Sequence, residues 1–296
     1  MTETILHSLD TVYSADSVEF CPIPDYQQYC AIGTYQVLEQ EKEKETNRTG
    51  KFMIHQTDDE FTNVFSQNTS AILDMKWSFQ LIGGKPCLAI VTATGDTVLY
   101  QLDQDGKALE YQSLNNRKNV LNLAVDWKNR FGGDTGLAVS QSDGNISLLS
   151  STPSGLVELE EWNAHDLEAW TVGFNYHDTS VLYTGGDDCM FKIWDIRDLN
   201  SPSLVNKKHS AGVTTVACHP SKNLILTGSY DDHIRVWDPR SMYTPVSTIH
   251  TGGGVWRLRF DPNDHTRILA ACMYNGFHIY SMDGNIFLMQ NHSICH

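Results

Sequence analysis

The stretch LYTGGDDCMFKIWDIR at residues 182–197 decides the fold, because it recurs as ILTGSYDDHIRVWDPR at residues 225–240. Each copy joins two largely apolar segments through a turn rich in Gly and Asp, and each closes with Trp-Asp-x-Arg. Short β-branched segments separated by such a turn are typical of antiparallel β-strands. The Trp-Asp pairs begin at Trp194 and Trp237, 43 residues apart. This spacing predicts a repeated β unit of about 40–45 residues.

Fainter copies of the same unit flank the two clear ones. Each combines a short β-branched or aromatic segment with a second segment and a polar turn. The set predicts an all-β chain with six recognisable blades of a WD-repeat β-propeller, forming a single domain over residues 1–296. The paired segments are 17–22 with 30–37, 72–77 with 88–102, 121–127 with 137–150, 170–176 with the first clear copy, 213–220 with the second, and 254–262 with 268–282.

The clear copies each carry a His, a Thr, an Asp and a Trp at matching positions. WD repeats use such a set as a buried hydrogen-bond network that links the outer strand to the inner turn. We predict structural roles for these residues, because losing one would leave a buried polar group unpaired, at a cost of about 1–3 kcal/mol. The two sets are His165, Thr184, Asp188 and Trp194, and His209, Thr227, Asp231 and Trp237.

Three stretches depart from the repeat. Residues 39–50, EQEKEKETNRTG, are charged and predict a disordered loop within the first blade, before a strand at 51–56. The segment TILHSLDT at 4–11 has the pattern of an outer strand that one chain end donates, and its acceptor would be a seventh blade after residue 285. Residues 287–296 are too short for three further strands. We therefore expect six recognisable blades of seven, with the last blade truncated, and a frayed tail rather than a metal site in the final HSICH.

Composition restricts the partners. The net charge is −15, which argues against nucleic-acid binding, and the seven cysteines include no C-x-x-C pair. No signal-peptide pattern opens the chain and no apolar run approaches about 18 residues, so we expect a cytoplasmic protein, also present in the nucleus, with no membrane partner. The nucleophile elbow, the H-E-x-x-H motif, the P-loop and the dinucleotide motif are absent, so we expect no metal and no cofactor.

Several stretches go beyond the blade pattern and resemble the WD-repeat diphthine methylesterases of diphthamide biosynthesis. The resemblance extends from about residue 15 to about 280, and members of that family continue with another blade. The matching pieces are ADSVEFCP (15–22), GTYQ (33–36), TSAILDMKW (69–77), EAW (168–170), FNY (174–176), TGGDD (184–188), TGSYDDHI (227–234), GGVWR (253–257) and AACMYNGF (270–277).

The resemblance implies an enzyme, a carboxylic ester hydrolase. The family removes the methyl ester of over-methylated diphthine on elongation factor 2, leaving the carboxylate for the final amidation to diphthamide. The implied partner is thus elongation factor 2, and the reacting side chain carries a trimethylammonium group beside the ester. A quaternary ammonium is held by aromatic faces, assisted by carboxylates.

The substrate-binding candidates are expected on one face, near the tight turns and the starts of the inner strands. Trp170, Tyr230 and Trp256 would contribute to an aromatic cage, with Asp74 nearby. The alternative stays open that both Trp residues are core residues of the inner strands.

The catalytic candidates are expected on the same face. Glu168, Asp187 or Asp232 would act as general base for an attacking water or offset the cation, and Arg257 would stabilise the oxyanion. These acids would otherwise be turn caps. Cys272 and Ser70 lie in matching pieces, but neither has a base adjacent in sequence, so we favour a carboxylate or histidine that activates water.

The main alternative is a non-catalytic adaptor. WDIR at 194–197 and WDPR at 237–240 resemble the W-D-x-R pattern of substrate receptors of cullin-4 ubiquitin ligases, which adds a ligase adaptor as a second partner. A simpler interpretation is that Arg197 and Arg240 pair with the Asp of their own motif. A histone- or phosphopeptide-binding propeller would need a basic or aromatic pocket, and the acidic balance disfavours phosphopeptides.

Overall fold

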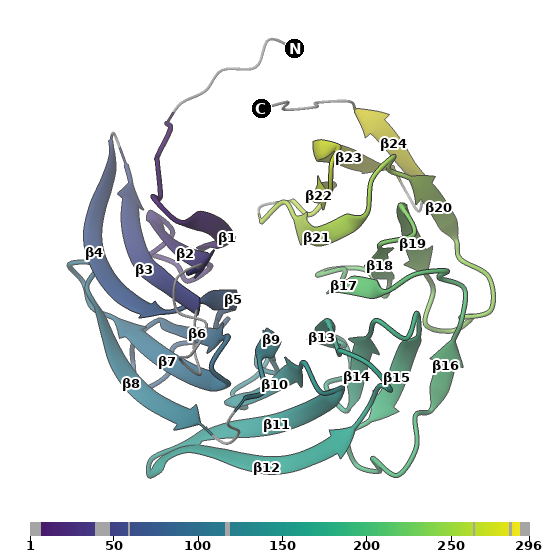
Figure 1. Ribbon diagram of the computed structural model, residues 1–296, viewed down its shortest axis with the longest axis horizontal. Helices are drawn as coiled ribbons and strands as arrows, with labels where there is room; N and C mark the ends of the chain where they lie inside the picture. The colour runs from purple at the N-terminus through teal and green to yellow at the C-terminus, as the bar shows by residue number, and fades with distance from the viewer. Residues whose placement is uncertain are drawn as a thin grey trace. The chain divides into compact units, whose positions relative to one another are not determined.

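The computed structural model describes residues 7–38, 48–58, 60–115, 119–262, 264–283 and 286–290, with the backbone alone at 283 and 286–290. Every regular element in these residues is a β-strand, and the strands form six four-stranded sheets (Figure 1). Each sheet takes four strands that follow one another in the sequence. This is the blade topology of a β-propeller, so the predicted fold class is confirmed.

Contacts divide the chain into two compact units, which we describe separately. Unit 1 comprises Met1–Val125 and Ser151–Val157, and unit 2 comprises Asp126–Ser150 and Glu158–His296. The first two blades belong to unit 1 and the last three to unit 2. The strands of the third blade are divided between the units.

Unit 1 has a core built from both of its complete blades. Phe52, Ile54, Met75 and Leu88 are fully buried there. Every residue of Cys87–Thr92 is buried, because this strand lies inside its sheet and is covered on both faces. The strands are β1 (Ser14–Phe20), β2 (Tyr29–Val37), β3 (Arg48–Thr57) and β4 (Phe61–Ser70), then β5 (Ile72–Trp77), β6 (Cys87–Thr92), β7 (Asp96–Leu102) and β8 (Ala108–Asn115).

The third blade repeats the burial pattern of the second. All six residues of its second strand, Gly136–Gln141, are buried, whereas all but one of the residues of the outermost strand, Gly155–Asn163, are exposed or partly buried. Its strands are β9 (Asn122–Trp127), β10 (Gly136–Gln141), β11 (Asn145–Thr152) and β12 (Gly155–Asn163).

Unit 2 packs its last three blades through Tyr183, Phe191, Val213 and Trp237, and through Leu226, Val255 and Leu258. Their strands are β13 (Thr171–Phe174), β14 (Val181–Gly185), β15 (Phe191–Asp195) and β16 (Leu204–Asn206), β17 (Val213–Cys218), β18 (Ile225–Ser229), β19 (His233–Trp237) and β20 (Ser247–His250), and β21 (Val255–Phe260), β22 (Arg267–Cys272), β23 (Gly276–Asp283) and β24 (Ile286–Gln290).

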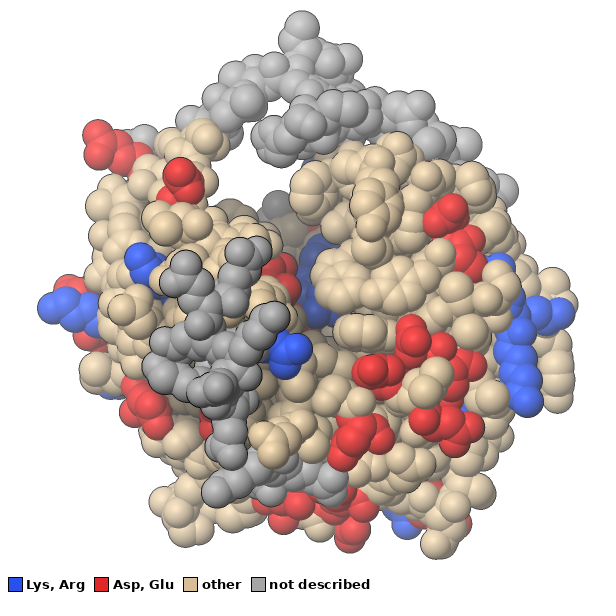
Figure 2. All heavy atoms as spheres, in the orientation of Figure 1, with Lys and Arg blue, Asp and Glu red and all other residues tan. Residues whose placement is uncertain are grey.

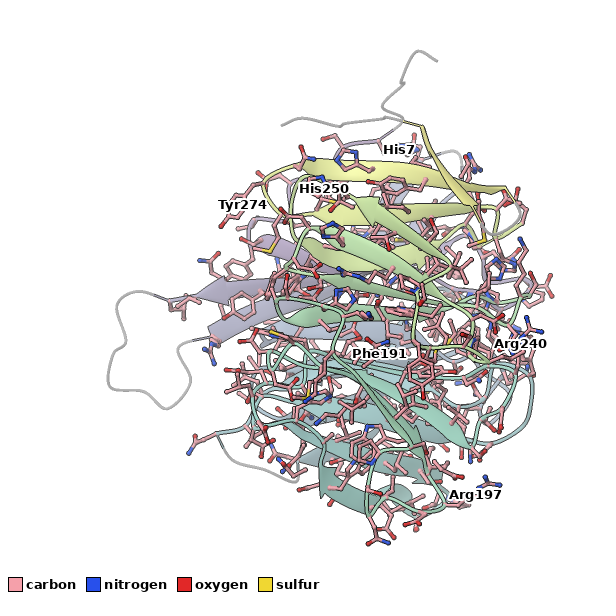
Figure 3. The ribbon with its side chains drawn as sticks, turned by 90° about the vertical axis from the view of Figure 1, so that its right-hand side faces the viewer. His7, Phe191, Arg197, Arg240, His250 and Tyr274 are labelled. Atoms are coloured by element: carbon pink, nitrogen blue, oxygen red, sulfur yellow. The ribbon has the colours of Figure 1, made fainter. Side chains whose placement is uncertain are left out.

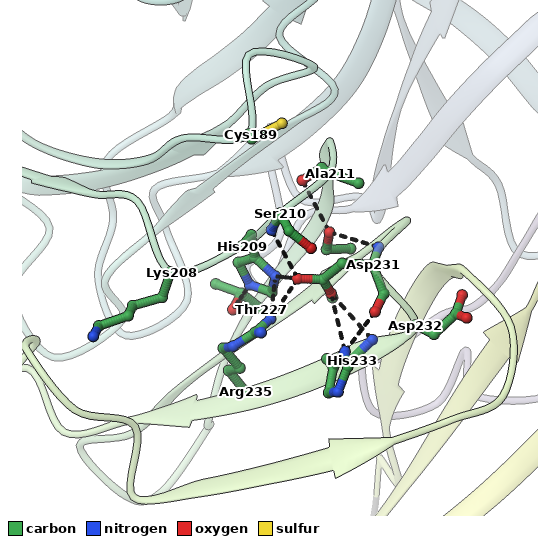
Figure 4. Close-up of polar contacts among 12 residues, drawn as sticks. Cys189, Lys208, His209, Ser210, Ala211, Thr227, Asp231, Asp232, His233 and Arg235 are labelled. Carbon is green, nitrogen blue, oxygen red and sulfur yellow. Dashed lines mark hydrogen bonds and ion pairs between the residues drawn. The ribbon is translucent and has the colours of Figure 1, made fainter.

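Two blades of unit 2 each contain a four-residue hydrogen-bond network. His209 contacts Asp231 through Nδ1 at 3.0 Å and Thr227 through Nε2 at 2.7 Å, and Figure 4 shows these contacts. The Trp237 indole N–H donates to the same Thr227 hydroxyl at 2.9 Å. One tautomer satisfies every group: His Nδ1–H donates to Asp231, and the Thr hydroxyl donates to Nε2 while it accepts from Trp237.

The preceding blade repeats this network. His165 Nδ1 lies 2.9 Å from Asp188 Oδ1, and its Nε2 lies 2.8 Å from the Thr184 hydroxyl, which accepts from Trp194 at 3.0 Å. Burial lowers the pKa of His165 more than the Asp188 hydrogen bond raises it. Burial alone would raise the pKa of Asp188, but the His165 hydrogen bond and other contacts outweigh it and lower that pKa. The pair is therefore a neutral imidazole that donates to a carboxylate.

The charged stretch of the first blade is shorter than predicted. The predicted loop at 39–50 ends early, because β3 begins at Arg48 and Thr49 pairs with both Gln36 and Ser70. Backbone pairing on both sides stabilises strand in residues whose side chains carry no apolar pattern. Residues 39–47 lie outside the described residues.

The predicted donated strand at 4–11 is wrong for its described part. Residues 7–11 form no strand, and the last blade draws its fourth strand, β24, from its own sequence. The final HSICH lies outside the described residues. The six cysteines in the described part of the chain are free, and five of them are buried. Among the described residues, no helix is long and apolar enough to cross a membrane.

Replacing Asp231 by Ala should lower the free energy of unfolding by about 3 kcal/mol, because the buried carboxylate accepts from His209, Ser210 and Arg235. The measurement is urea unfolding followed by fluorescence. Asp238→Ala is the matched control, since its partner Arg240 is exposed and the pair contributes little. Equal losses in the two variants would contradict the role of the network.

Acidification from pH 7.5 to 5.5 should lower the thermal midpoint. Burial lowers the pKa of His165 and His209, as it does for His219, whose pKa is about 4. The unfolded chain takes up these protons near pH 6.5, whereas the folded chain does not, so stability falls as the pH drops through that value. A midpoint that rises in this window would show that the buried rings are charged in the folded state.

Candidate functional site

The blades of unit 2 share one end at which the first strand begins and the second strand stops. Thr171 at the start of β13 pairs with Gly185 at the end of β14. Val255 at the start of β21 likewise pairs with Cys272 at the end of β22. We call this the entry end, and we call the opposite end, where β13, β17 and β21 stop, the exit end. The segments before the first strands and the turns after the second strands therefore lie together at the entry end.

Three aromatic side chains from three successive blades meet at the entry end. The ring centroid of Trp170 lies 5.7 Å from that of Trp256 and 6.3 Å from that of Tyr230, and Tyr230 and Trp256 are 6.1 Å apart. Both contacts of Trp170 are edge-to-face, which the ring quadrupole favours. All three side chains are only partly buried. We call these three residues the aromatic cluster.

Trp256 owes its position to an irregularity of β21. The β21–β22 register shifts between Val255 and Arg257, which leaves Trp256 as the extra residue of a β-bulge. A bulge redirects a side chain away from the face that the regular pleat would assign. The Arg257 guanidinium carbon lies 5.5 Å from the centroid of the Trp256 ring, within the range of a cation–π contact.

Asp187 is held against the aromatic cluster. The Trp170 indole N–H donates to its Oδ1 at 3.0 Å, and its own backbone N–H donates to the Glu168 carbonyl at 2.9 Å. Asp187 precedes the network residue Asp188, so the network fixes the turn that presents this carboxylate. Figure 2 shows acidic side chains gathered over the blades formed by β13–β16 and β17–β20.

The pKa of Tyr230 also shows that Asp187 and Arg257 lie near this ring. Burial raises the pKa of its phenol, the charge of Asp187 raises it further, and the charge of Arg257 opposes both. The negative charge of Asp187 and the positive charge of Arg257 therefore shift the pKa of the Tyr230 phenol in opposite directions. The site combines aromatic faces, a carboxylate and a guanidinium within one unit.

Two further predicted acids lie at the entry end but make different contacts. Glu168 contributes its backbone carbonyl to Asp187, and its side chain is partly exposed. Asp232 occupies a left-handed conformation, φ 59°, and its carbonyl accepts from the N–H and the hydroxyl of Thr251, both at 2.9 Å. Figure 4 shows the Asp232 side chain directed away from the His209–Asp231 contacts.

Asp74 has the environment of a structural acid. It is buried in β5 of unit 1, and its Oδ2 accepts from the backbone N–H of Val125 in β9 at 3.1 Å. This contact joins two neighbouring blades, and the predicted place of Asp74 beside the substrate stays a prediction. Sequence position alone does not distinguish the two roles, because both require an acid near the start of an inner strand.

The two alternative nucleophiles lack activation. Burial raises the pKa of the Cys272 thiol to about 11, which disfavours the thiolate that attack requires. Ser70 ends β4 in unit 1, where its hydroxyl accepts from Thr94 at 2.9 Å. No described His contacts either of these side chains through a hydrogen bond.

Glycines that sequence reasoning did not select shape the site. A Cβ on Gly212 would lie 2.6 Å from Asp187 Oδ1 and 3.1 Å from the Tyr230 ring. A Cβ on Gly254 would lie 3.3 Å from that ring, and the Gly254 carbonyl accepts from Met273 N–H at 2.7 Å. The run of glycines before β21 was a visible signal, but a turn explains it equally well without coordinates.

This arrangement suits a ligand that carries a cation and reacts at a polar group near it. The aromatic faces attract a quaternary ammonium, and Asp187 adds charge attraction. A carboxylate also accepts a proton from water, and a guanidinium stabilises a developing oxyanion. Among the described residues, no group of three or more His, Cys, Asp or Glu is placed to hold a metal ion.

Comparisons with known proteins agree with the repeat and extend it. A family model described as "WD domain, G-beta repeat" matches residues 157–195 and 201–238. A chain in a crystal structure of a mitotic checkpoint complex has a similar fold, with a TM-score of 0.70 and 17% identity, covering 100% of this chain and 89% of that chain.

Curated relatives cover almost the whole chain. The diphthine methyltransferase homolog of Dictyostelium discoideum is 36% identical over 96% of this chain and 85% of the relative. The diphthine methyltransferase of Mus musculus is 35% identical over 94% of this chain and 63% of its own length. The chain thus spans less than two thirds of the mouse relative.

Gly212→Ala should displace Asp187 and break its contact with Trp170, because the added methyl would overlap Oδ1. The indole N–H resonance of Trp170 should move by NMR, with the fold retained. Gly133→Ala is the control, since a Cβ there meets nothing within 4 Å. An unmoved Trp170 resonance would mean that Asp187 is not confined by Gly212.

Proposed function

The chain belongs to the diphthine methyltransferase family, and on this premise we propose that it hydrolyses the methyl ester of methylated diphthine on elongation factor 2. The names of its relatives support a place in diphthamide biosynthesis as an enzyme that acts on a methyl group. The proposal adds two statements to this: the reaction is hydrolysis of the ester, and the protein substrate is elongation factor 2.

The aromatic cluster is the observation that carries the proposal. Its three rings lie within 6.3 Å of one another at one end of the blades, with the Asp187 carboxylate bound to the Trp170 N–H. A trimethylammonium group has no hydrogen to donate, so its recognition rests on ring faces and nearby negative charge. The substrate that the family name indicates carries such a group on the modified side chain.

The hydrolytic step follows from the groups around the cluster. Asp187 takes a proton from water as the water oxygen attacks the ester carbonyl. The oxyanion that forms is stabilised by Arg257, whose guanidinium lies over Trp256. Collapse breaks the bond to the methoxy oxygen, which leaves as methanol with the proton that Asp187 held. The product is the carboxylate that an amidation consumes.

The adaptor hypothesis uses other residues and is compatible with this one. Arg197 and Arg240 each contact the Asp of their own motif at 2.6 Å, and their side chains are 73% and 83% exposed. The simpler interpretation of W-D-x-R is therefore observed in both motifs. Figure 3 shows both arginines on the side of the ribbon opposite Tyr274, which lies in an entry-end turn. A partner bound there would leave the aromatic cluster accessible.

Asp187→Asn should lower kcat about 100-fold, because the amide still accepts from Trp170 but cannot take the proton from water. Trp256→Ala should raise KM about tenfold through loss of one ring face. The assay incubates the chain with elongation factor 2 that bears methylated diphthine and follows loss of the methyl ester by mass spectrometry.

Arg197→Ala and Arg240→Ala are the controls, and both should hydrolyse the ester at the wild-type rate. If they lose a cullin-4 ligase adaptor in pull-downs while hydrolysis persists, the second role is supported as well. An intact ester after incubation with the wild-type chain, under conditions in which a full-length relative removes it, would refute the proposal.

A further inference from the structure

His219 is a buried side chain with an unused hydrogen-bond donor. It lies in the connection between β17 and β18 at the exit end and is 1% exposed. Its Nδ1 accepts from the backbone N–H groups of Ser221 and Lys222, at 3.1 and 3.0 Å. A nitrogen that accepts carries no proton, so the proton of the neutral ring is on Nε2. Nε2 is buried and has no hydrogen-bond partner among the described residues.

The His219 ring packs against the next blade. Because Nδ1 is bound to the turn that follows His219, the opposite edge points away from that turn. The ring centroid lies 4.9 Å from Phe260, at the end of β21, and 6.3 Å from His265, in the connection to β22. The ring that carries the unused donor thus lies at the junction of two exit-end connections.

Basic side chains from four connections surround this junction. Arg130 follows β9, His177 follows β13, Lys222 follows β17 and His265 follows β21. Burial, and after it the charges of these four neighbours, together lower the pKa of His219 to about 4. His177 Nε2 lies 3.3 Å from the His219 carbonyl and 3.1 Å from the Lys222 carbonyl, so it joins two of the connections.

Three acidic side chains of the exit-end connections have partners within their own segments, and a fourth acid, Asp126 in β9, accepts from the backbone N–H of Phe174 at 2.8 Å. Asp178 accepts from the N–H and hydroxyl of Ser180, at 3.1 and 2.6 Å. Asp261 pairs with Arg267 at 2.5 Å. Asp264 accepts from the N–H and hydroxyl of Thr266. None of these acids contacts His219 through a hydrogen bond, so the junction is a basic site in a chain of net charge −15.

We propose that this junction binds a phosphoryl group or another divalent oxyanion, with His219 Nε2–H as its central donor, Arg130 and Lys222 as its cations and the His265 ring at its edge. An oxyanion oxygen at Nε2 would satisfy the buried donor and would lie among charges of opposite sign. The His265 ring lies beside His219 and is itself partly exposed, so the junction borders the protein surface. The site is at the opposite end of the blades from the aromatic cluster and does not depend on the proposed hydrolysis.

The binding experiment uses the intact chain. Isothermal titration with inorganic phosphate at constant ionic strength should give saturable binding, and phosphate should shift the ring proton resonances of His219 and His265. A second arm compares a phosphoserine peptide with its unphosphorylated form, to distinguish a free anion from a phosphoprotein. Binding of the phosphopeptide alone would assign the site to a protein partner, and binding of both anions would assign it to the phosphoryl group itself.

His219→Asn is the decisive variant, because its side-chain oxygen still accepts from the turn N–H groups while the imidazole N–H is lost. Phosphate affinity should fall about tenfold or more. Lys222→Ala, an exposed change, should weaken binding about threefold, and Arg240→Ala should leave it unchanged. Absence of binding of both phosphate and the phosphoserine peptide to the wild type, equal heats from chloride, or undiminished affinity in His219→Asn would each overturn the proposal.

Discussion

The buried network of His, Thr, Asp and Trp is the constraint on which the rest of unit 2 depends. In each of two blades it joins the segment before the first strand, the second strand, the following turn and the third strand through one imidazole. Because the imidazole is neutral and donates to a carboxylate, the Asp is the only charged residue among the four of each network. The same hydrogen bonds that hold the blade also fix the turn that follows its second strand.

The candidate site residues are neighbours of this network in sequence. Asp187 precedes Asp188, and Tyr230 precedes Asp231, so each network acid anchors a turn whose preceding residue faces the aromatic cluster. Trp170 reaches the same place from the segment that begins with His165. In each of the two turns, a candidate site residue is thus followed directly by the Asp of the network. The same repeat therefore contains both kinds of residue.

The two ends of unit 2 differ in chemistry although the same strands supply both. The entry end combines aromatic faces with Asp187, whereas the exit end collects His219 and basic side chains from four connections. Net charge describes neither end well. The value of −15 correctly described an acidic surface, but it argued against an anion site that local geometry supports.

The sequence by itself determined the blade architecture, because the spacing of Trp194 and Trp237 and the matching polar residues are local and periodic. It also selected Trp170, Tyr230 and Trp256, which lie in pieces beyond the blade pattern. The tertiary structure alone decided which side chains meet. The bulge that redirects Trp256, the space left by Gly212, and the burial of Asp74 against Val125 depend on packing between blades. The sequence gives the type of each residue, but contacts between blades join residues that are tens of positions apart, and no local spacing records which of them meet.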